Sequence, residues 1–418
     1  MSVVLSRGAR FTAGEALPGG IFLELIGSGD TLRPNLLYWQ NGEHSVASVV
    51  EHGSLKYKPR SVNASILRAL SLPCGVGSFT SERELCGEVC DLVAKFVGLS
   101  PKVCSLLARV VMATWVLDAL ECAPTILLEG PDRERAVRVL RLAHCLCRRG
   151  LPMSAVTPTS LCTLPSRMHF TLLIRQQVIS SRLGDVLQAV SRRDTPVLRG
   201  GQLRDLFATQ FILCDQVADC ADWPGAMLRV PCVPANGKLP AFDPETQRRV
   251  AGELQPKLLA YRFARYADVG ASSFDSSKFV LPLRELASTL AATTPTDGGL
   301  QNDLHALLEN GNSEIRSARW VDLDGVIIES LAVFCREAKE STIFVGQIAE
   351  VCEAILKGRG EPRNVDPGEV GRRLKAFGLS TEPRVAQGVR LRISNAVAVR
   401  VQELAQELDV PGRNTVLV

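Results

Sequence analysis

The sequence predicts a mixed α/β protein built on a parallel sheet with flanking helices, preceded by a small β module and followed by a basic module of helices and strands. Apolar runs at 125–129, 171–174, 210–214 and 226–234 alternate with helical stretches, which is typical of a parallel sheet covered on both faces. The chain has 418 residues, 46% of them hydrophobic and 22% charged, which allows two or three domains and excludes a disordered protein.

Cysteine usage and the N-terminus indicate a protein of a reducing compartment. The thirteen cysteines are scattered, no CxxC pair occurs, and no second pair accompanies the cluster of His144, Cys145 and Cys147. We therefore expect buried thiols and no metal. The first twenty residues lack the apolar core of a signal peptide, and the most apolar region, 103–128, carries charges that a membrane span tolerates poorly. We expect a cytoplasmic protein that contacts no membrane.

Local patterns divide the chain into five expected segments. These are a small β module (1–60), a helical bridge (61–123), the α/β core (124–270), a helical lid or connector (271–342) and the basic C-terminal module (343–418). Strands are expected at 20–27, 35–39, 45–50 and 54–58, and helices at 82–97, 101–121, 244–266, 279–291 and 324–340. Pro101 fits the first turn of its helix.

The stretch TILLEGPDRER has the outline of a phosphate-binding P-loop, because an apolar strand runs into a glycine turn and a long helix. The P-loop pattern is GxxxxGK[ST]: backbone N–H groups cradle phosphates, the lysine neutralises charge and the hydroxyl holds magnesium. Counted from Gly130, the second glycine, the lysine and the hydroxyl fall at Arg135, Ala136 and Val137. We expect a vestigial nucleotide-binding turn at Gly130, Pro131 and Arg135, without the chemistry of a P-loop.

The second half of such a site is an apolar strand that ends in acidic residues for magnesium and water. The strand is present as HFTLLIRQQ, but Arg175 and Gln176 stand where the acids would follow. Two half-sites that keep their strands and lose their catalytic residues favour a degenerate ATPase fold. The alternative is an unrelated doubly wound domain, because strand–turn–helix units are common.

The surrounding sequence resembles a group of bacterial and prophage AAA+ or superfamily III helicase-like ATPases. ATWVLDALECAPTILLEGP resembles the approach to the group's P-loop, and RRGLPMSAVTPTSLCTLPSRMHFTLLI resembles the passage to its acidic strand. The resemblance covers residues 80–260 and the C-terminal module, and implies a P-loop-like sheet and a replication-associated role. The arginine that usually precedes the group's fourth strand is missing from DWPGA (222–226), so hydrolysis and ring assembly do not carry over.

The long helix after the turn is rich in arginine. It carries Arg133, Arg135, Arg138, Arg141, Arg148 and Arg149. These side chains either meet phosphates or form a solvated face opposite Val137, Leu140 and His144, and we favour the solvated face.

A second motif, VDLDGVIIES (321–330), matches the DxDG start of haloacid-dehalogenase phosphatases. The preceding SEIRSARW is polar and does not form the buried strand that such a nucleophile needs. We expect Asp324 to cap the following helix instead.

The C-terminal module predicts a winged helix–turn–helix. A helix at 343–358 is followed by a second helix that starts at Asp366-Pro367, a helix cap and a first-turn proline. Val389, Leu391 and Ile393 then alternate with arginines as in a strand, and the preceding EPRVAQG would form the tip of the wing. VGRRLKAFGLSTEPRVAQGVRLRIS also resembles the winged-helix segment of the ATPase group.

Positive charge is concentrated in this module. Between Lys357 and Arg400 ten Lys and Arg face four acids, a net charge of +6 against +4 for the whole chain. Such a local excess is expected where phosphates are contacted. The candidate DNA-binding residues are Arg372, Arg373, Lys375, Arg384, Arg390 and Arg392.

We therefore expect a catalytically inactive AAA+-like protein that binds DNA through its C-terminal module, uses no cofactor, and acts as a scaffold or regulator of an active ATPase in replication or mobile-element maintenance. Two alternatives stay open. One is an active but unorthodox NTPase that uses Arg135 in place of the lysine. The other is a protein-interaction scaffold that does not bind DNA. The oligomeric state is not fixed by the sequence.

Overall fold

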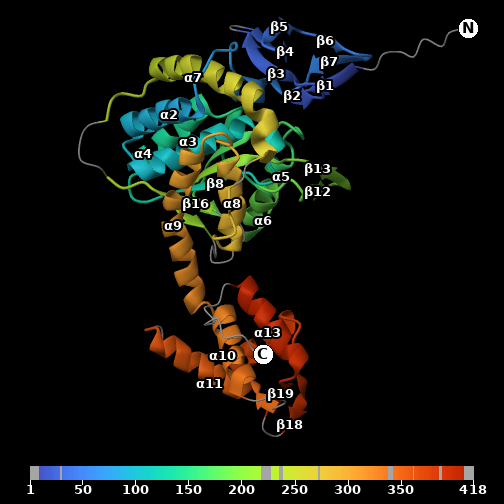
Figure 1. Ribbon diagram of the computed structural model, residues 1–418. Coiled ribbons are helices and arrows are strands. Elements are labelled where there is room, and N and C mark those ends of the chain that lie inside the picture. The colour runs from blue at the N-terminus through green and yellow to red at the C-terminus, as the bar shows by residue number, and fades with distance from the viewer. Residues whose placement is uncertain are drawn as a thin grey trace, which may run out of the picture. The chain divides into compact units, whose positions relative to one another are not determined.

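The computed structural model describes residues 9–28, 31–217, 227–234, 239–271, 274–337, 342–360, 362–385 and 388–408. Two compact units share the chain. The core unit comprises Met1–Lys278 and Pro282–Leu307, and the C-terminal unit comprises Phe279–Leu281 and Leu308–Val418 (Figure 1).

A five-stranded parallel sheet forms the centre of the core unit, as the sequence predicted. Its strand order is β16-β8-β14-β10-β9, and every neighbouring pair is parallel. The strands are β8 (Thr125–Glu129), β9 (Gly150–Ser154), β10 (Thr171–Arg175), β14 (Thr209–Leu213) and β16 (Met227–Pro231). The four apolar runs all form strands of this sheet, which confirms the α/β fold class.

The fifth strand, β9, was not predicted. Its sequence GLPMS has no alternation, and Pro152 lies in its middle. A proline is tolerated there because β9 is an edge strand that pairs on one side with β10, where Pro152 lies opposite Leu173. The neighbouring strand therefore decides the structure of this segment more than its own residues do.

Helices cover one face of the sheet (Figure 1). They are α2 (Glu82–Val97), α3 (Pro101–Trp115) and α4 (Arg133–Leu146), and α7 (Pro244–Arg265) packs on α4. Phe211 of β14 packs among apolar side chains of α2, α3 and α4. The next residue, Ile212, belongs to the cluster on the opposite face together with Leu183 and Leu187 of α6 (Ser181–Val190).

The helix predicted at 82–97 is confirmed, and it ends at Gly98 in the left-handed conformation with φ of +69°.

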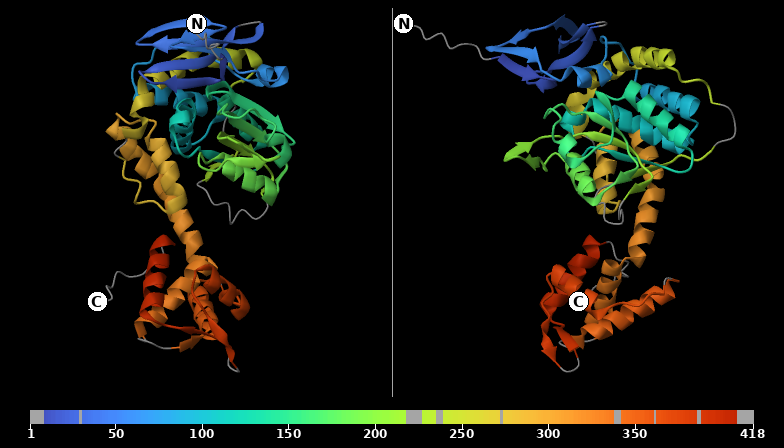
Figure 2. Two further views of the ribbon diagram at one scale, coloured as in Figure 1. Left: turned by 90° about the vertical axis from the view of Figure 1, so that its right-hand side faces the viewer. Right: turned by 180° about the vertical axis from the view of Figure 1, so that it is seen from behind.

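The N-terminal β module packs on the core unit and shares its hydrophobic cluster. Leu23, Leu25 and Leu36 are buried together with Leu151 and Leu172 of the central sheet. The module contains β1 (Ala9–Thr12), β2 (Gly14–Leu17), β3 (Ile21–Ser28), β4 (Thr31–Gln40), β5 (Glu43–Ala47), β6 (Val50–His52) and β7 (Leu55–Pro59), in sheets ordered β2-β3-β4-β5 and β1-β7-β6. Figure 2 shows the module, in blue, from two sides. The predicted runs at 20–27, 35–39 and 54–58 form β3, β4 and β7, while the run at 45–50 is divided between β5 and β6. The strands β1 and β2 and the short helix α1 (Ala64–Ala69) were not expected.

Shorter elements complete the core unit. These are η1 (Leu117–Ala119), α5 (Pro158–Leu161), β11 (Val178–Ile179), the hairpin β12 (Val197–Arg199) and β13 (Gln202–Arg204), β15 (Gln216–Val217), η3 (Tyr266–Ala271) and α8 (Leu281–Ala291). Helix α9 (Gly298–Val321) begins in the core unit and ends in the C-terminal unit.

The C-terminal unit contains α10 (Leu323–Glu337), β17 (Thr342–Phe344), α11 (Val345–Gly358), α12 (Pro367–Ala376), β18 (Glu382–Val385), β19 (Gly388–Arg392) and α13 (Asn395–Glu407). Its three strands form an antiparallel sheet of order β17-β19-β18. Ile348, Cys352, Leu374 and Leu391 lie in its fully buried core. The helix–helix–strands–helix order agrees with the sequence prediction.

Two details of this unit differ from the prediction. The helix expected from residue 343 starts at Val345, because Thr342–Phe344 pair with β19 as a third strand. The segment EPRVAQG, expected as the tip of a wing, begins with the strand β18. Both segments form strands because they pair with β19.

Among the described residues, no helix combines the length and apolar character needed to cross a membrane. Within the same residues, no three His, Cys, Asp or Glu side chains are grouped so that they could hold a metal ion.

Candidate nucleic-acid interface and the P-loop-like turn

The turn after β8 is held against the segment that follows β16. The amide of Cys232 donates to the carbonyl of Glu129 at 2.5 Å, and the amide of Asp132 donates to the carbonyl of Cys232 at 3.0 Å. Gly130 has φ of +117°, and a Cβ there would lie 2.5 Å from the Cys232 carbonyl oxygen. The glycine is therefore needed for this close approach. The turn is fastened to β16, and the amide of Asp132 is already used.

A carboxylate occupies the N-terminus of α4. Asp132 is the N-cap, and its Oδ1 accepts a hydrogen bond from the Arg135 amide at 2.9 Å. The N-terminus of this helix is where a P-loop would bind phosphate. The Arg135 side chain is only 5% exposed; its Nε lies 3.3 Å from Asp132 Oδ2 and its Nη1 donates to the Gly98 carbonyl at 3.1 Å. Gly130, Pro131 and Arg135 are thus close together, but Arg135 points into the protein.

The carboxyl ends of the other strands carry no unpaired acid among the described residues. Arg175 at the end of β10 is exposed. Gln176 accepts a hydrogen bond from the Val156 amide at 2.6 Å and donates to the Val156 carbonyl at 2.9 Å, so it ties β10 to the loop after β9. Asp215, after β14, forms an ion pair with Arg133. Gln176 therefore has a structural role in the place of one acid, and the exposed Arg175 brings a positive charge to the place of the other.

The solvated arginine face expected along a helix at 132–149 is wrong for three of its arginines, and the helix itself, α4, ends at Leu146, before Arg148 and Arg149. Arg135, Arg148 and Arg149 are buried. Arg138 is half-buried and donates to the carbonyls of Phe96 and Pro240. The periodicity could not distinguish these side chains from solvated ones, because their partners lie far away in the sequence.

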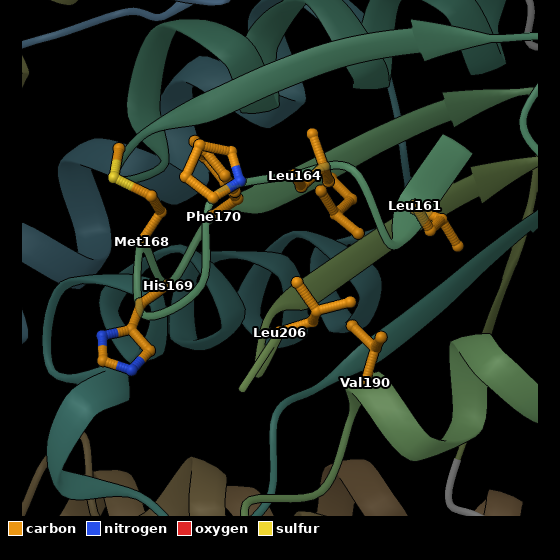
Figure 3. A pocket seen from close by; sticks show the side chains of 9 residues that line it. Leu161, Leu164, Met168, His169, Phe170, Val190 and Leu206 are labelled. Carbon is orange, nitrogen blue, oxygen red and sulfur yellow. The ribbon is translucent and has the colours of Figure 1, made fainter. Parts of the chain in front are cut away.

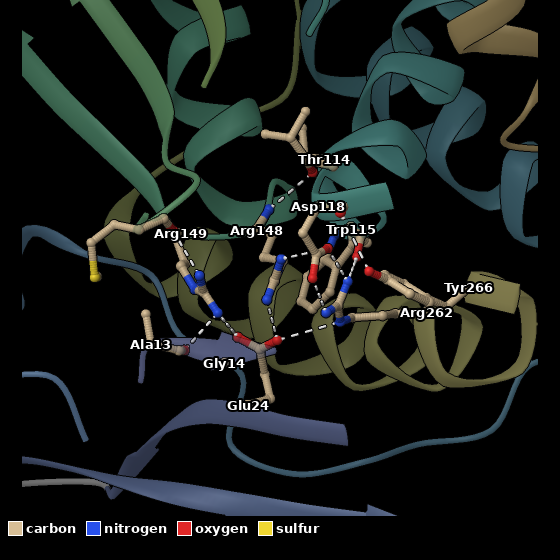
Figure 4. Close-up of polar contacts among 12 residues, drawn as sticks. Ala13, Gly14, Glu24, Thr114, Trp115, Asp118, Arg148, Arg149, Arg262 and Tyr266 are labelled. Carbon is tan, nitrogen blue, oxygen red and sulfur yellow. Dashed lines mark hydrogen bonds and ion pairs between the residues drawn. The ribbon is translucent and has the colours of Figure 1, made fainter. Parts of the chain in front are cut away.

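Arg148 and Arg149 belong to a buried ion-pair cluster that joins the β module to the core (Figure 4). Glu24 on β3 lies at its centre and pairs with Arg148 Nη2 at 2.5 Å, with Arg149 and with Arg262 Nε at 3.5 Å. Asp118 pairs with Arg262 Nη2 at 2.6 Å and with Arg148 Nη1 at 3.3 Å. All five side chains are at most 9% exposed. The acid within the apolar run IFLELIG was the sequence signal for this cluster.

The arginines keep both carboxylates charged. Burial alone raises the pKa of Glu24, but the charges of Arg148, Arg149 and Arg262 outweigh it and lower the pKa below its usual value. The pKa of Asp118 is lowered in the same way, against its burial, by Arg262 and Arg148. Each acid therefore stabilises the fold while it is ionised and would lose that contribution as the pH falls through its lowered pKa.

His169 is among the residues that line a small apolar pocket, with Leu161, Leu164, Met168 and neighbouring side chains, and its imidazole points away from the others (Figure 3). The volume open to the centre of a water molecule there is about 10 Å³, which suits one water and no larger ligand. Burial, aided by Arg148 and Arg149 and opposed by Asp118, lowers the pKa of His169 to about 4. The imidazole is therefore neutral at pH 7.

Stability is expected to fall between pH 6.5 and pH 5 through His169. An unfolded histidine binds its proton near pH 6.5, whereas folded His169 does so only near pH 4. The unfolded state therefore binds more protons in this window, and the melting temperature should drop as the pH is lowered. His169→Gln should flatten the dependence, measured by thermal unfolding at several pH values. An unchanged slope in the variant would contradict this assignment.

Helix α12 presents two of the candidate DNA-binding residues to solvent. Arg372 and Lys375 are exposed, and neither forms an ion pair with any residue that the structure describes. Asp366 caps the helix and accepts hydrogen bonds from the amides of Gly368 and Glu369. The opposite face, with Val370 and Leu374, is buried in the core of the unit. The cationic side chains thus lie on a helix whose other face is packed in the core of the unit.

Arg373 is engaged within the unit. Its guanidinium pairs with Asp324 of α10 and, at 2.9 Å, with Glu369 one turn earlier on α12. Asp324 was expected to cap its helix, but α10 starts at Leu323 and Asp324 lies in the first turn. Its carboxylate instead joins α10 to α12.

The strands carry the remaining candidates. Arg390 on β19 pairs with Glu382 on β18 at 3.1 Å, and Arg392 at the end of β19 is exposed. The side chain of Arg384 lies outside the described residues. The unit therefore presents Arg372, Lys375 and Arg392 without a described ion-pair partner.

Comparison with known proteins gave structural likenesses alone. No family model matches the chain, and no curated protein matches its sequence. A solved structure described as an active helicase, SCCmec type IV Cch, is 11% identical, with a TM-score of 0.42 over 93% of this chain and 79% of that one. The NrS-1 C-terminal region is 9% identical, with a TM-score of 0.37 over 89% and 96%.

Cdc6p from Pyrobaculum aerophilum is 12% identical, with a TM-score of 0.20 over 87% of this chain and 100% of that one. At such scores none of these likenesses carries a functional argument, and the function has to be inferred from the site.

Proposed function

We propose that this protein binds DNA through its C-terminal unit, as a winged helix–turn–helix, and does not hydrolyse ATP. The observation that carries the proposal is the outward face of α12, where Arg372 and Lys375 are exposed on a helix whose other face is buried. Recognition helices of helix–turn–helix modules lie in the major groove, with cations on phosphates. The net charge of +6 between residues 357 and 400 supports binding to a polyanion.

The absence of hydrolysis is supported by the P-loop-like turn. Ala136 and Val137 stand where a lysine and a hydroxyl would act, and Asp132 occupies the helix N-terminus. A triphosphate would meet this carboxylate at close range, and like charges repel. We propose that the core unit serves as a scaffold or regulator for an active replication or mobile-element ATPase.

The two alternatives remain testable. An NTPase that used Arg135 as its lysine would need to free this side chain from Asp132 and Gly98, so the geometry supports it less. Such an enzyme would show phosphate release that is lost in Arg135→Ala. A protein-interaction scaffold without DNA affinity would show no binding to duplex DNA at low salt.

The test of the DNA-binding surface removes its two exposed charges. Arg372→Ala/Lys375→Ala should weaken binding to duplex DNA by roughly 10- to 100-fold and reduce its salt dependence. The control, Lys95→Ala/Lys102→Ala, removes two exposed charges from the core unit and should bind like the wild type. Fluorescence anisotropy with a labelled duplex measures both. Equal losses in the two variants would show that net charge, and not α12, governs binding.

A further inference from the structure

Arg372 is the one arginine among the exposed residues of α12. Val370 and Leu374 point into the core, and the exposed positions are Pro367, Gly368, Arg372, Lys375 and Ala376. Gly368 and Ala376 lie one turn before and one turn after Arg372, on the same side of the helix. Gly368 and Ala376 are small and leave room beside Arg372. The other two neighbours on this side are Glu369, whose carboxylate pairs with Arg373 at 2.9 Å, and Lys375.

The second arginine of this helix is not equivalent to the first. Arg373 pairs with Asp324 on α10 and with Glu369, and it is half-buried between them. Two carboxylates already use its planar fork of donors, so Arg373 is a positioning residue that fixes α12 against α10. Arg372 is therefore the arginine of α12 whose guanidinium has no described carboxylate partner.

The residues of α12 also favour duplex DNA over a single strand or duplex RNA as the nucleic acid that it would bind. Its sequence PGEVGRRLKA contains no aromatic residue on which an unstacked base could lie. Proteins that bind single strands rely on such stacking, and the deep, narrow major groove of duplex RNA does not admit side chains. The major groove of B-form DNA does admit an α-helix.

We infer that Arg372 reads a guanine in the major groove of duplex DNA, while Lys375 binds a neighbouring phosphate without regard to sequence. This inference rests on the proposed DNA binding and adds specificity to it. The arginine fork matches the O6 and N7 acceptors of guanine in a bidentate contact, whereas the lysine ammonium acts as a point charge. The two residues should therefore differ in what their loss does to sequence preference.

The experiment starts with selection of a preferred duplex from a randomised pool by the full-length wild-type chain. Affinities are then measured for that duplex, for copies in which single guanines are replaced by 7-deazaguanine, and for its single strand. For one guanine, the wild type should lose about 5- to 150-fold on removal of N7. Arg372→Ala should bind the two duplexes equally. Arg372→Lys should not restore discrimination, because lysine lacks the fork.

Lys375→Ala is the matched control, since it removes one exposed charge from the same face. It should weaken binding to both duplexes alike and keep the wild-type ratio between them. The inference is overturned if Arg372→Ala keeps the discrimination, if no guanine matters, or if the single strand binds as tightly. In those cases duplex binding that is weakened by the α12 variants would leave the proposed function standing. No duplex binding at low salt would overturn both.

Discussion

Glu24→Gln is expected to destabilise the core unit by about 3–5 kcal/mol. The carboxylate of Glu24 is buried and faces Arg148, Arg149 and Arg262, with Asp118 as the one other acid in the cluster. A neutral amide of nearly the same shape would leave three buried guanidinium groups against one carboxylate. Removing one partner of a buried ion pair is strongly destabilising, because the charge of the other partner stays buried without compensation.

Urea-induced unfolding of the full chain measures this change. Glu15→Gln is the control, because Glu15 pairs with Arg10 on the surface at 2.8 Å and such pairs contribute about 0–1 kcal/mol. Equal effects of the two substitutions would show that the cluster does not fasten the β module to the core. A matched loss in Arg149→Met, which removes one cation, would further support the role of the pairing.

Gly130→Ala is expected to destabilise the core unit by on the order of 3 kcal/mol. The backbone there has φ of +117°, a conformation in which a side chain is strained, and the new Cβ would lie 2.5 Å from the Cys232 carbonyl oxygen. The turn would have to separate from β16 and give up the hydrogen bond between Asp132 and Cys232.

The matched control is Gly75→Ala, because a Cβ at Gly75 meets nothing within 4 Å. Thermal unfolding should show a large drop for the first variant and a small change for the second. A wild-type melting temperature for Gly130→Ala would mean that the turn is open, as a phosphate-binding loop would be, and would weaken the case against nucleotide binding.

The fold was largely predictable where the residues of a segment determine its own structure. The apolar runs TILLE and QFILC form buried strands, and the cap at Asp366 starts α12 as expected. Strand β9 was missed because its proline is tolerated through its place at the sheet edge. The strand Thr342–Phe344 was missed because its pairing partner, β19, lies far along the chain.

The candidate site was predictable in its residue types and less so in their environment. The motif counts located the missing lysine and acids at Ala136, Arg175 and Gln176. They could not reveal that Asp132 caps α4, nor that Arg373 pairs with Asp324, which is 49 residues away. Long-range ion pairs leave no periodic signal, so charge counting alone does not distinguish a free arginine from a paired one.

The central claim is that the chain binds DNA electrostatically and does not turn over ATP. The most direct test follows binding of the full-length protein to a labelled duplex between about 50 and 200 mM salt, with phosphate release from ATP measured in the same buffers. We expect affinity that falls steeply as salt rises, and no phosphate release above background. Salt-independent binding, no binding at the lowest salt, or ATP turnover that is lost in Arg135→Ala would contradict the claim.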